Sequence, residues 1–132
     1  MSQWQRFGTT KRMKFGTNVR QREIVSIPFP YSDIFVNKKR PVLIISNKRY
    51  HENNKDIICC AITSSEKFIY GGISIDNKDL EEGRLKVKST VKPGKIYSLH
   101  QNRIVRKIER LTIEKTKEVI MNLNLDVEID GD

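Results

Sequence analysis

The sequence predicts a mainly β fold of the α+β class, built as a small, strongly bent antiparallel sheet or partly open barrel with one C-terminal helix. Short apolar runs of strand length recur between polar turns, and two of them, Val42–Ile45 and Ile57–Ile62, are apolar on both faces. Helical spacing is sustained only over residues 112–124. A chain of 132 residues is long enough for one domain with a modest core.

The first two strands are expected at Glu23–Phe29 and Val42–Ile45, joined by a polar loop over Pro30–Lys39. Pro28 restricts the end of the first strand to a sheet edge or a bulge, because proline cannot donate to a ladder. For the same reason, Pro41 is expected as the first residue of the second strand. Since the second strand is apolar on both faces, we expect it near the middle of the sheet.

Asn47–Lys55 is interpreted as a polar connector, whose His51 has no second His or Cys at the spacing of a metal site. Asp56–Thr63 predicts the second buried strand. Cys59 and Cys60 are neighbours in this strand and therefore point to opposite faces of the sheet. We interpret both as small buried hydrophobes that share neither a disulfide nor a metal.

The second half of the chain predicts shorter elements and one helix. In order, we expect a half-buried strand within Phe68–Ile75, an acidic turn with one helical turn over Asp76–Gly83, a strand with one positive face at Leu85–Lys88, a turn at Pro93–Gly94, a strand at Ile96–Leu99 and a short piece at Ile104–Ile108. The helix is expected to begin after an N-cap at Thr112, with Glu114 in its first turn, and to end near Asn124. Its buried face is expected to comprise Thr116, Val119, Ile120 and Leu123.

The net charge of +9 is unevenly distributed along the chain. Residues 1–22 carry six Lys or Arg and no acid, residues 84–110 carry nine against Glu109 alone, and the last eight residues carry four acids and no base. This asymmetry favours a nucleic-acid partner, with a generally basic surface as the alternative. We divide the chain into a flexible basic arm (1–21), one folded domain (22–125) and an acidic tail (126–132). The aromatics of the arm could stack on bases or pack against the sheet.

The sequence contains no apolar run of transmembrane length and no secretory signal, so a cytoplasmic protein without a membrane partner is expected. It also contains no Cys/His ligand cluster, no P-loop and no nucleophile elbow. A nuclease built from these residues would act on RNA, whose 2′-OH is an internal nucleophile. The protein would supply a cation for the developing charge and groups that move protons.

Arg40 and the pair Thr63–Ser64 are the candidate catalytic residues. Arg40 precedes a rigid strand, and its planar guanidinium can grip two phosphate oxygens. Thr63 and Ser64 end the other buried strand, where their hydroxyls could contact a phosphate or donate to a leaving oxygen. The alternatives are a solvated charge at a strand end for Arg40 and an ordinary strand end capped by its own hydroxyls for Thr63–Ser64.

Several segments together resemble a known family. They are Glu23-Ile24-Val25 with Phe29 and Pro30, the R-P-V-L-I-I-S-N run at residues 40–47, the A-I-T-S run at residues 61–64, and a later segment with Ser89, Val91, Ile96 and Ser98. In this combined spacing the chain resembles, over residues 22–125, the MazF/PemK/Kid family of mRNA interferases, the toxins of type II toxin–antitoxin pairs. Arg22 stands where the family usually has Gly, which predicts a different backbone turn there. We place no counterpart of the acidic–basic pair that some members use on a later strand.

The resemblance implies an SH3-like, CcdB/PemK-like barrel that forms a homodimer. It implies a sequence-specific, metal-independent and cofactor-free endoribonuclease that cleaves single-stranded mRNA by 2′-OH attack and leaves a 2′,3′-cyclic phosphate. Arg40 and Thr63 would be catalytic, with Ser64 as a supporting contact. The partner would be an acidic antitoxin of MazE type and, together with it, operator DNA.

The residues expected to bind nucleic acid are Tyr31, Lys38, Lys39, Lys86, Lys88, Lys95 and His100. His100 is also a candidate for proton transfer, with a surface histidine as the alternative. A second hypothesis for the whole chain is a non-catalytic module on the same fold that binds nucleic acid and regulates transcription.

Overall fold

In the computed structural model of the chain, which describes residues 19–28, 39–64 and 69–131, seven strands form one antiparallel sheet. In chain order the elements are β1 (Glu23–Pro28), β2 (Lys39–Ile44), α3 (Lys48–Asn53), β3 (Asp56–Thr63), β4 (Ile73–Ile75), a 3-10 turn (Asn77–Asp79), β5 (Leu80–Glu82), β6 (Ser89–His100), a second 3-10 turn (Gln101–Arg103), β7 (Arg106–Leu111) and α4 (Ile113–Asp126). The expected arm before residue 19, Phe29 and the loop that follows it, and Phe68 lie outside the described residues.

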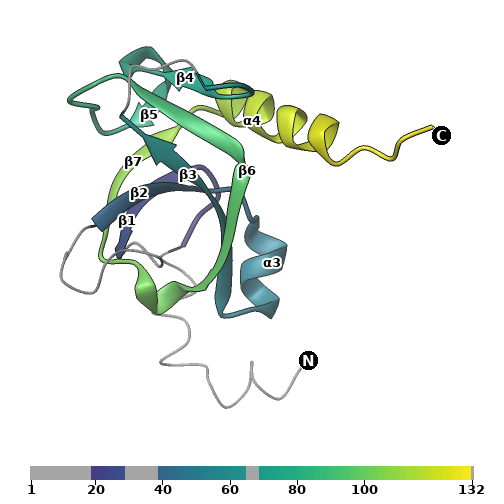
Figure 1. The fold of residues 1–132 in the computed structure, drawn as a ribbon. Coiled ribbons are helices and arrows are strands. Elements are labelled where there is room, and N and C mark those ends of the chain that lie inside the picture. Colours follow the sequence, from purple (N-terminus) through teal and green to yellow (C-terminus); the bar gives the residue numbers. More distant parts are fainter. Residues whose placement is uncertain (1–18, 29–38, 65–68, 132) are drawn as a thin grey trace.

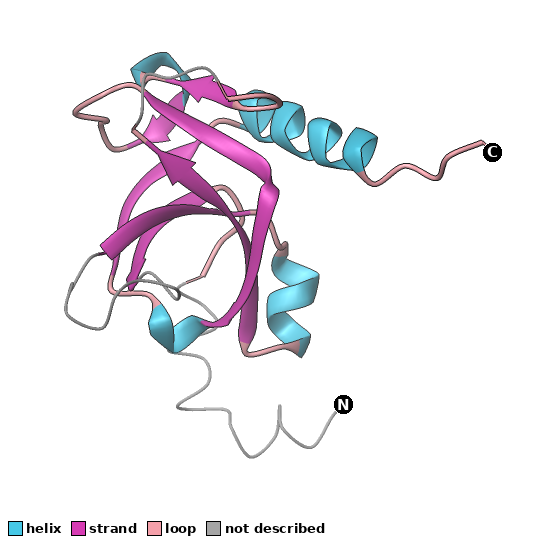
Figure 2. Cartoon of the chain, viewed as in Figure 1, coloured by secondary structure: helices cyan, strands magenta, loops and turns pink. Residues whose placement is uncertain are grey.

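The sheet has the order β4-β6-β3-β2-β1-β7-β5, and it curls into a half-barrel with α4 packed across one end (Figure 1). Its strands make up most of the body, as the colouring by secondary structure shows (Figure 2). β2 is the central strand, as predicted from a sequence that is apolar on both faces. β3 spans the same residues that the sequence predicted. The predicted fold class, a bent antiparallel sheet with a C-terminal helix, is confirmed.

Both faces of the sheet are buried, because successive side chains of β2 and β3 enter different clusters. Leu43 and Cys60 belong to the first cluster, into which α4 inserts Val119. Val42 and Cys59 belong to the second cluster, on the inside of the barrel. The two cysteines are free and buried, as their neighbouring positions predicted.

Two expectations for the second half of the chain are wrong. Leu85–Lys88 is a loop, held where the Leu85 N–H donates to Asn77 Oδ1 (2.7 Å) and the Leu85 side chain packs against the first cluster. Pro93–Gly94 is not a turn between two strands, because β6 is continuous across it. The register jumps there, from Ile96 opposite Cys60 to Lys92 opposite Ala61, so residues 93–95 form a bulge that bends the strand.

Two expectations for the first half also fail. The connector after β2 contains helix α3, because the Asn47 side chain accepts a hydrogen bond from the Tyr50 N–H (3.0 Å) and caps its start. Pro41 is the third residue of β2 and lies opposite Ser26 of β1. Proline is tolerated there because the ladder with β3 begins only at Val42, so that side of Pro41 needs no donor.

Helix α4 begins as predicted and continues two residues beyond the expected end. The Thr112 hydroxyl accepts a hydrogen bond from the Lys115 N–H (3.2 Å), and Glu114 lies in the first turn. Thr116 and Val119 are buried, whereas Ile120 and Leu123 are only half-buried. The helix therefore covers the sheet with its first half. β7 also differs from the prediction, since it extends to Leu111.

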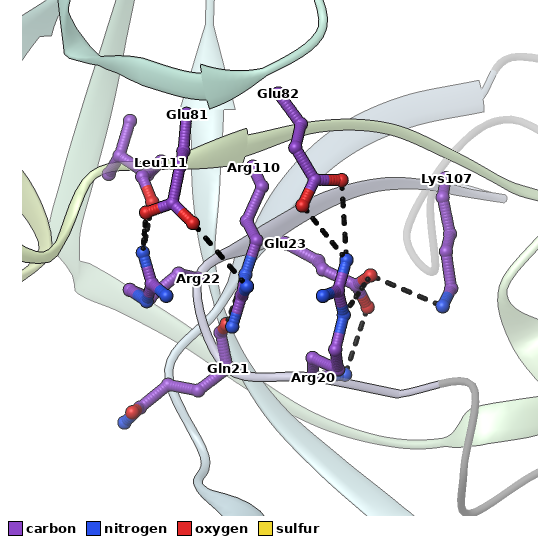
Figure 3. A network of polar contacts seen from close by, with 9 residues as sticks. All are labelled: Arg20, Gln21, Arg22, Glu23, Glu81, Glu82, Lys107, Arg110 and Leu111. Carbon is purple, nitrogen blue, oxygen red and sulfur yellow. Dashed lines mark hydrogen bonds and ion pairs between the residues drawn. The ribbon is translucent and has the colours of Figure 1, made fainter.

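Arg22 keeps a backbone conformation that glycine favours. Its φ is 80°, the region in which non-glycine residues are strained. The side chain compensates, since one guanidinium nitrogen donates to Glu81 Oε2 (2.7 Å) and to the Leu111 carbonyl (2.9 Å). Arg22 thus joins the start of β1 to β5 and to the end of β7 (Figure 3).

Candidate functional site

The ends of β2, β3 and β6 meet at one corner of the half-barrel. Val42 of β2 lies opposite Ala61 of β3. Arg40 and Thr63, each two residues nearer its strand end, line the same two hollows. Thr63 in turn lies opposite Thr90 of β6. The two residues that the sequence singled out from separate runs are therefore brought together at this corner.

Two hollows open on either side of this corner, and Arg40, Pro41, Ile62 and Thr63 line both. The inner hollow lies on the face of the second cluster, has a volume of about 230 Å³, and is also lined by Ile27, Val42, Ala61, Lys92, Lys95 and Tyr97. The outer hollow, of about 360 Å³, is completed by Lys39, Ser64 and Ser89. None of the described lining residues is acidic, so the lining combines cations and hydroxyls with an apolar floor.

Five of the predicted site residues are thus brought together. Arg40, Thr63 and Ser64 share the outer hollow with Lys39, while Lys95 faces the inner one. Arg40 and Ser64 are exposed and Thr63 is half-buried, so a bound polyanion could reach all three side chains.

The other predicted nucleic-acid contacts are not part of this group. Lys86 and Lys88 lie exposed on the loop that leads to Ser89. His100 is opposite Asp56, at the far end of β3 from Thr63, and its Nδ1 accepts a hydrogen bond from the Asn102 N–H (3.0 Å). Tyr31 and Lys38 lie outside the described residues.

Sequence reasoning missed Lys92, Tyr97 and Ser89 as residues of the site. The assumed turn at Pro93–Gly94 divided β6 in two and hid the fact that Lys92, Lys95 and Tyr97 face one hollow. The available signal was the proline–glycine pair with a basic residue on each side, because such a pair can also form a bulge within one continuous strand.

Four other basic residues are paired with carboxylates in a polar network around β1, β5 and β7 (Figure 3). Arg20 and Lys107 pair with the buried carboxylate of Glu23 (3.2 Å each), and Arg22 and Arg110 pair with Glu81 (2.7 and 3.7 Å). Arg22, followed by Arg110 and Arg20, holds the pKa of the Glu81 carboxyl below its usual value. These arginines and lysines serve the fold.

Lys86, Lys88, Lys92 and Lys95 differ from the basic residues of that network. Among the described residues, none of these four lysines forms an ion pair with a carboxylate. Of these four, Lys92 and Lys95 therefore bring unneutralised positive charge to the inner hollow.

The two cysteines and Glu109 are further buried side chains that could take part in chemistry. Burial raises the pKa of Cys59 and of Cys60 to about 12, so both are uncharged thiols at neutral pH. Burial also raises the pKa of Glu109, against the opposing charge of Arg106, but Glu109 lies on β7 and lines neither hollow.

Within the described ranges, no three His, Cys, Asp or Glu side chains group as metal ligands. No helix in the part of the chain that the structure describes has the length and apolar character to cross a membrane.

Residues 20–125 match the model of a family described as the PemK-like, MazF-like toxin of type II toxin–antitoxin systems. No curated protein sequence matches the chain.

Three solved structures illustrate the likeness in fold. The first is an endoribonuclease in complex with its cognate antitoxin from a mycobacterial species (TM-score 0.67, 13% identity, 86% of this chain and 99% of that one). The second is MazE–MazF from Deinococcus radiodurans (TM-score 0.68, 18% identity, 85% and 98%). The third is the Mycobacterium tuberculosis toxin MazF-mt6 (TM-score 0.63, 16% identity, 83% and 99%). At these identities the likeness shows the fold, and the matched segment covers the corner where β2, β3 and β6 meet.

Proposed function

The chain belongs to the PemK-like, MazF-like toxin family of type II toxin–antitoxin systems, and from this premise we propose that it is a sequence-specific endoribonuclease acting on single-stranded mRNA. The observation that carries the proposal is that Arg40 and Thr63 together line two hollows whose described lining residues include no acid. A guanidinium beside hydroxyls and lysines can hold a phosphodiester and stabilise added negative charge on it. Two of the solved neighbours are described as an endoribonuclease and as a MazF toxin.

In the proposed reaction the ribose 2′-hydroxyl gives its proton to water as its oxygen attacks the adjacent phosphorus. The bond from phosphorus to the 5′-oxygen breaks, and this oxygen takes a proton from water. The products are a 2′,3′-cyclic phosphate and a free 5′-hydroxyl. Arg40 stabilises the charge on the non-bridging oxygens, and its planar fork can contact two of them. Thr63, with Ser64 beside it, donates a hydrogen bond to the phosphate or to the departing 5′-oxygen. No metal or cofactor takes part in this scheme.

We further propose that an acidic antitoxin of MazE type silences the enzyme. The structural neighbours from a mycobacterial species and from Deinococcus radiodurans were solved with an antitoxin and with MazE, and the acid-free lining of the two hollows suits an acidic partner. In the same proposal the chain is a cytoplasmic homodimer, and the toxin–antitoxin complex binds operator DNA.

The first experiment measures how fast the Arg40→Ala variant cleaves a single-stranded RNA. We expect a loss on the order of 10²–10³, the range found when one donor to transition-state charge is removed. Arg49→Ala is the matched control, because it removes the same charge from α3, outside both hollows. Arg40→Lys should restore little, since a point charge cannot form a two-toothed contact. Normal cleavage by a folded Arg40→Ala protein would leave the non-catalytic binding module as the better hypothesis.

The second experiment tests the nucleophile. Replacing the ribose on the 5′ side of the cleaved bond by deoxyribose should abolish the cut and leave binding nearly unchanged, because backbone charge supplies most of the affinity. Cleavage should also persist in EDTA. Cleavage of the deoxy-substituted substrate would assign the attack to water or to a side chain.

A further inference from the structure

The segment that follows α4 alternates apolar and acidic residues. From the last turn of the helix onward the sequence is Leu125-Asp126-Val127-Glu128-Ile129-Asp130. From here on we call this segment the tail; it overlaps the acidic tail expected at residues 126–132. The apolar side chains are uncovered, with exposed fractions of 66% for Leu125, 68% for Val127 and 93% for Ile129. The acidic residues are exposed as well and form no ion pair with any described residue. Nothing in the described part of the molecule explains three bare hydrophobes in such a short polar segment.

Leu125 and Asp126 form the end of α4 in the structure. If this last turn unwinds and the tail becomes extended, the alternation separates the two kinds of side chain. Successive residues of a strand point to opposite sides, so one side of the tail would be apolar and the other would carry only carboxylates. Such a segment fits a groove with an apolar floor and a basic rim.

The inner hollow has this chemistry. Ile27, Val42 and Ala61 supply apolar lining, together with the ring of Tyr97. Arg40, Lys92 and Lys95 supply positive charge, and no described acid lines the hollow. The tail is thus complementary to the hollow in both charge and hydrophobic pattern.

The tail of one molecule is badly placed to reach its own inner hollow. α4 packs through Val119 against the first cluster, whereas the inner hollow is lined by Ile27 and Val42 of the second cluster and by one residue of the first, Ile62. The tail also leaves the far end of α4 in the direction away from the barrel (Figure 1). An occupant of this sequence therefore has to come from another copy.

We propose that the tail of one copy binds in the inner hollow of a second copy, with its apolar side chains against the floor and its carboxylates on Arg40, Lys92 and Lys95. The consequence for RNA rests on the proposed function, because the same cations would then hold the substrate. Under that function, the chain restrains its own activity as its concentration rises.

The direct test is the binding of a fluorescent peptide with the sequence of residues 125–131 to the full chain, followed by anisotropy. The chain used carries Glu128→Lys and Asp130→Lys, so that its own tail does not compete. We expect binding that Lys92→Ala with Lys95→Ala weakens at least about tenfold, while Lys48→Ala with Lys55→Ala, which remove two exposed lysines outside the hollow, change it less than about twofold. A peptide of the same composition with its acids grouped at one end should bind at least about tenfold more weakly. Equal binding of the two peptides, or no binding, would overturn the proposal.

A second test leaves the charge unchanged. Val127→Ser with Ile129→Ser should abolish the fall in cleavage per molecule that the unaltered chain shows as its concentration increases. A restraint that is independent of concentration would overturn binding between copies. The peptide assay needs no cleavage, so a chain that binds the peptide but cuts no RNA would refute the proposed function alone. A chain that cuts RNA but ignores the peptide would refute this inference alone.

Discussion

At the scale of single residues, Arg22 shows how a strained backbone is retained. A φ of 80° costs a non-glycine residue about 1–2 kcal/mol relative to the right-handed regions. The backbone around it is fixed by the Arg22 N–H, which donates to the Ile44 carbonyl, and by the Leu111 N–H, which donates to the Arg22 carbonyl (2.8 Å each). The side chain adds its contacts to Glu81 and to the Leu111 carbonyl. The strain is thus offset by contacts that join β1 to three other strands.

This arrangement predicts that two small substitutions at Arg22 differ in stability. Both Arg22→Ala and Arg22→Gly lose the side-chain contacts, but only glycine adopts the positive φ without strain. We expect Arg22→Gly to be more stable than Arg22→Ala by about 1 kcal/mol in urea unfolding, and both to be less stable than the unaltered chain. Equal stability of the two variants would show that the strain at this position is negligible.

His51 is a second residue whose role depends on its surroundings. Its ring is the buried side chain of α3, where Nε2 lies 2.7 Å from the Ser46 hydroxyl, and the Ile58 N–H donates to the same hydroxyl (2.9 Å). Burial lowers the pKa of His51 below its ordinary value, against opposing effects of the Val19 backbone and the Glu23 carboxylate. The neutral ring of His51 can accept a hydrogen bond from the Ser46 hydroxyl, whereas the protonated ring cannot.

The lowered pKa predicts how stability depends on pH. The unfolded chain binds the His51 proton more readily than the folded chain, so this contribution is complete above pH 6.5 and is lost as the pH falls through the lowered pKa. Between about pH 7.5 and about pH 5.5, the free energy of unfolding should fall, and the slope should be smaller in His51→Gln. Identical slopes in both proteins would mean that His51 does not contribute to the pH dependence.

At the scale of elements, β6 is the strand on which the site depends. Its bulge at residues 93–95 lets the strand pair with β3 on both sides of a bend. Lys92 and Lys95, which lie at the bulge, both line the inner hollow. β6 also pairs with β4 and ends in the turn that leads to β7. The bend in this strand therefore shapes both the barrel and the candidate site.

Two glycines next to strands should respond differently to alanine. At Gly83, after β5, φ is +86°, and an added Cβ would lie 2.7 Å from Glu109 Cγ and 2.8 Å from the Ile108 carbonyl oxygen. We expect Gly83→Ala to destabilise the fold by at least about 1–2 kcal/mol. At Gly94, in the bulge, nothing lies within 4 Å of an added Cβ, so Gly94→Ala should change stability by less than about 0.5 kcal/mol. Thermal melts of both variants provide the comparison, and a large loss at Gly94 would mean that the bulge requires glycine.

At the scale of the whole molecule, the two sides of the sheet use their basic residues differently. Around β1, β5 and β7, arginines and lysines pair with Glu23, Glu81 and Glu82 and hold strands together. Around β2, β3 and β6, Lys39, Arg40, Lys92 and Lys95 line the two hollows. The net charge of +9 is therefore a poor measure of RNA affinity, and the number of cations at the hollows is a better one.

This distribution predicts the salt dependence of RNA binding. If the four cations at the hollows each contact one phosphate, the slope of log K against log[salt] should be about −3, at roughly −0.7 per contact for single strands. Lys92→Ala with Lys95→Ala should make the slope about 1.4 less steep, while Lys107→Ala should leave it unchanged. A slope near zero would show that the hollows do not bind the RNA backbone.

The sequence alone determined the central part of the fold. Val42–Ile45 and Ile57–Ile62 cannot be solvated on either face, so their composition is enough to place them in the middle of a sheet. The N-cap at Thr112 and the span of β3 were also predicted, because both are local features of the sequence. The candidate residues Arg40 and Thr63 were also accessible from sequence, because each adjoins one of the two buried runs.

Only the tertiary structure decided which residues share the hollows with Arg40 and Thr63. Lys92 and Lys95 are hydrophilic residues that could face solvent anywhere, and their position follows from the pairing of β6 with β3, in which Lys92 lies opposite Ala61. The conformation of Arg22 likewise depends on strands distant in the sequence. Hydrophobic burial leaves a periodic trace in the local sequence, whereas strand register and polar contacts are settled by partners that no local pattern identifies.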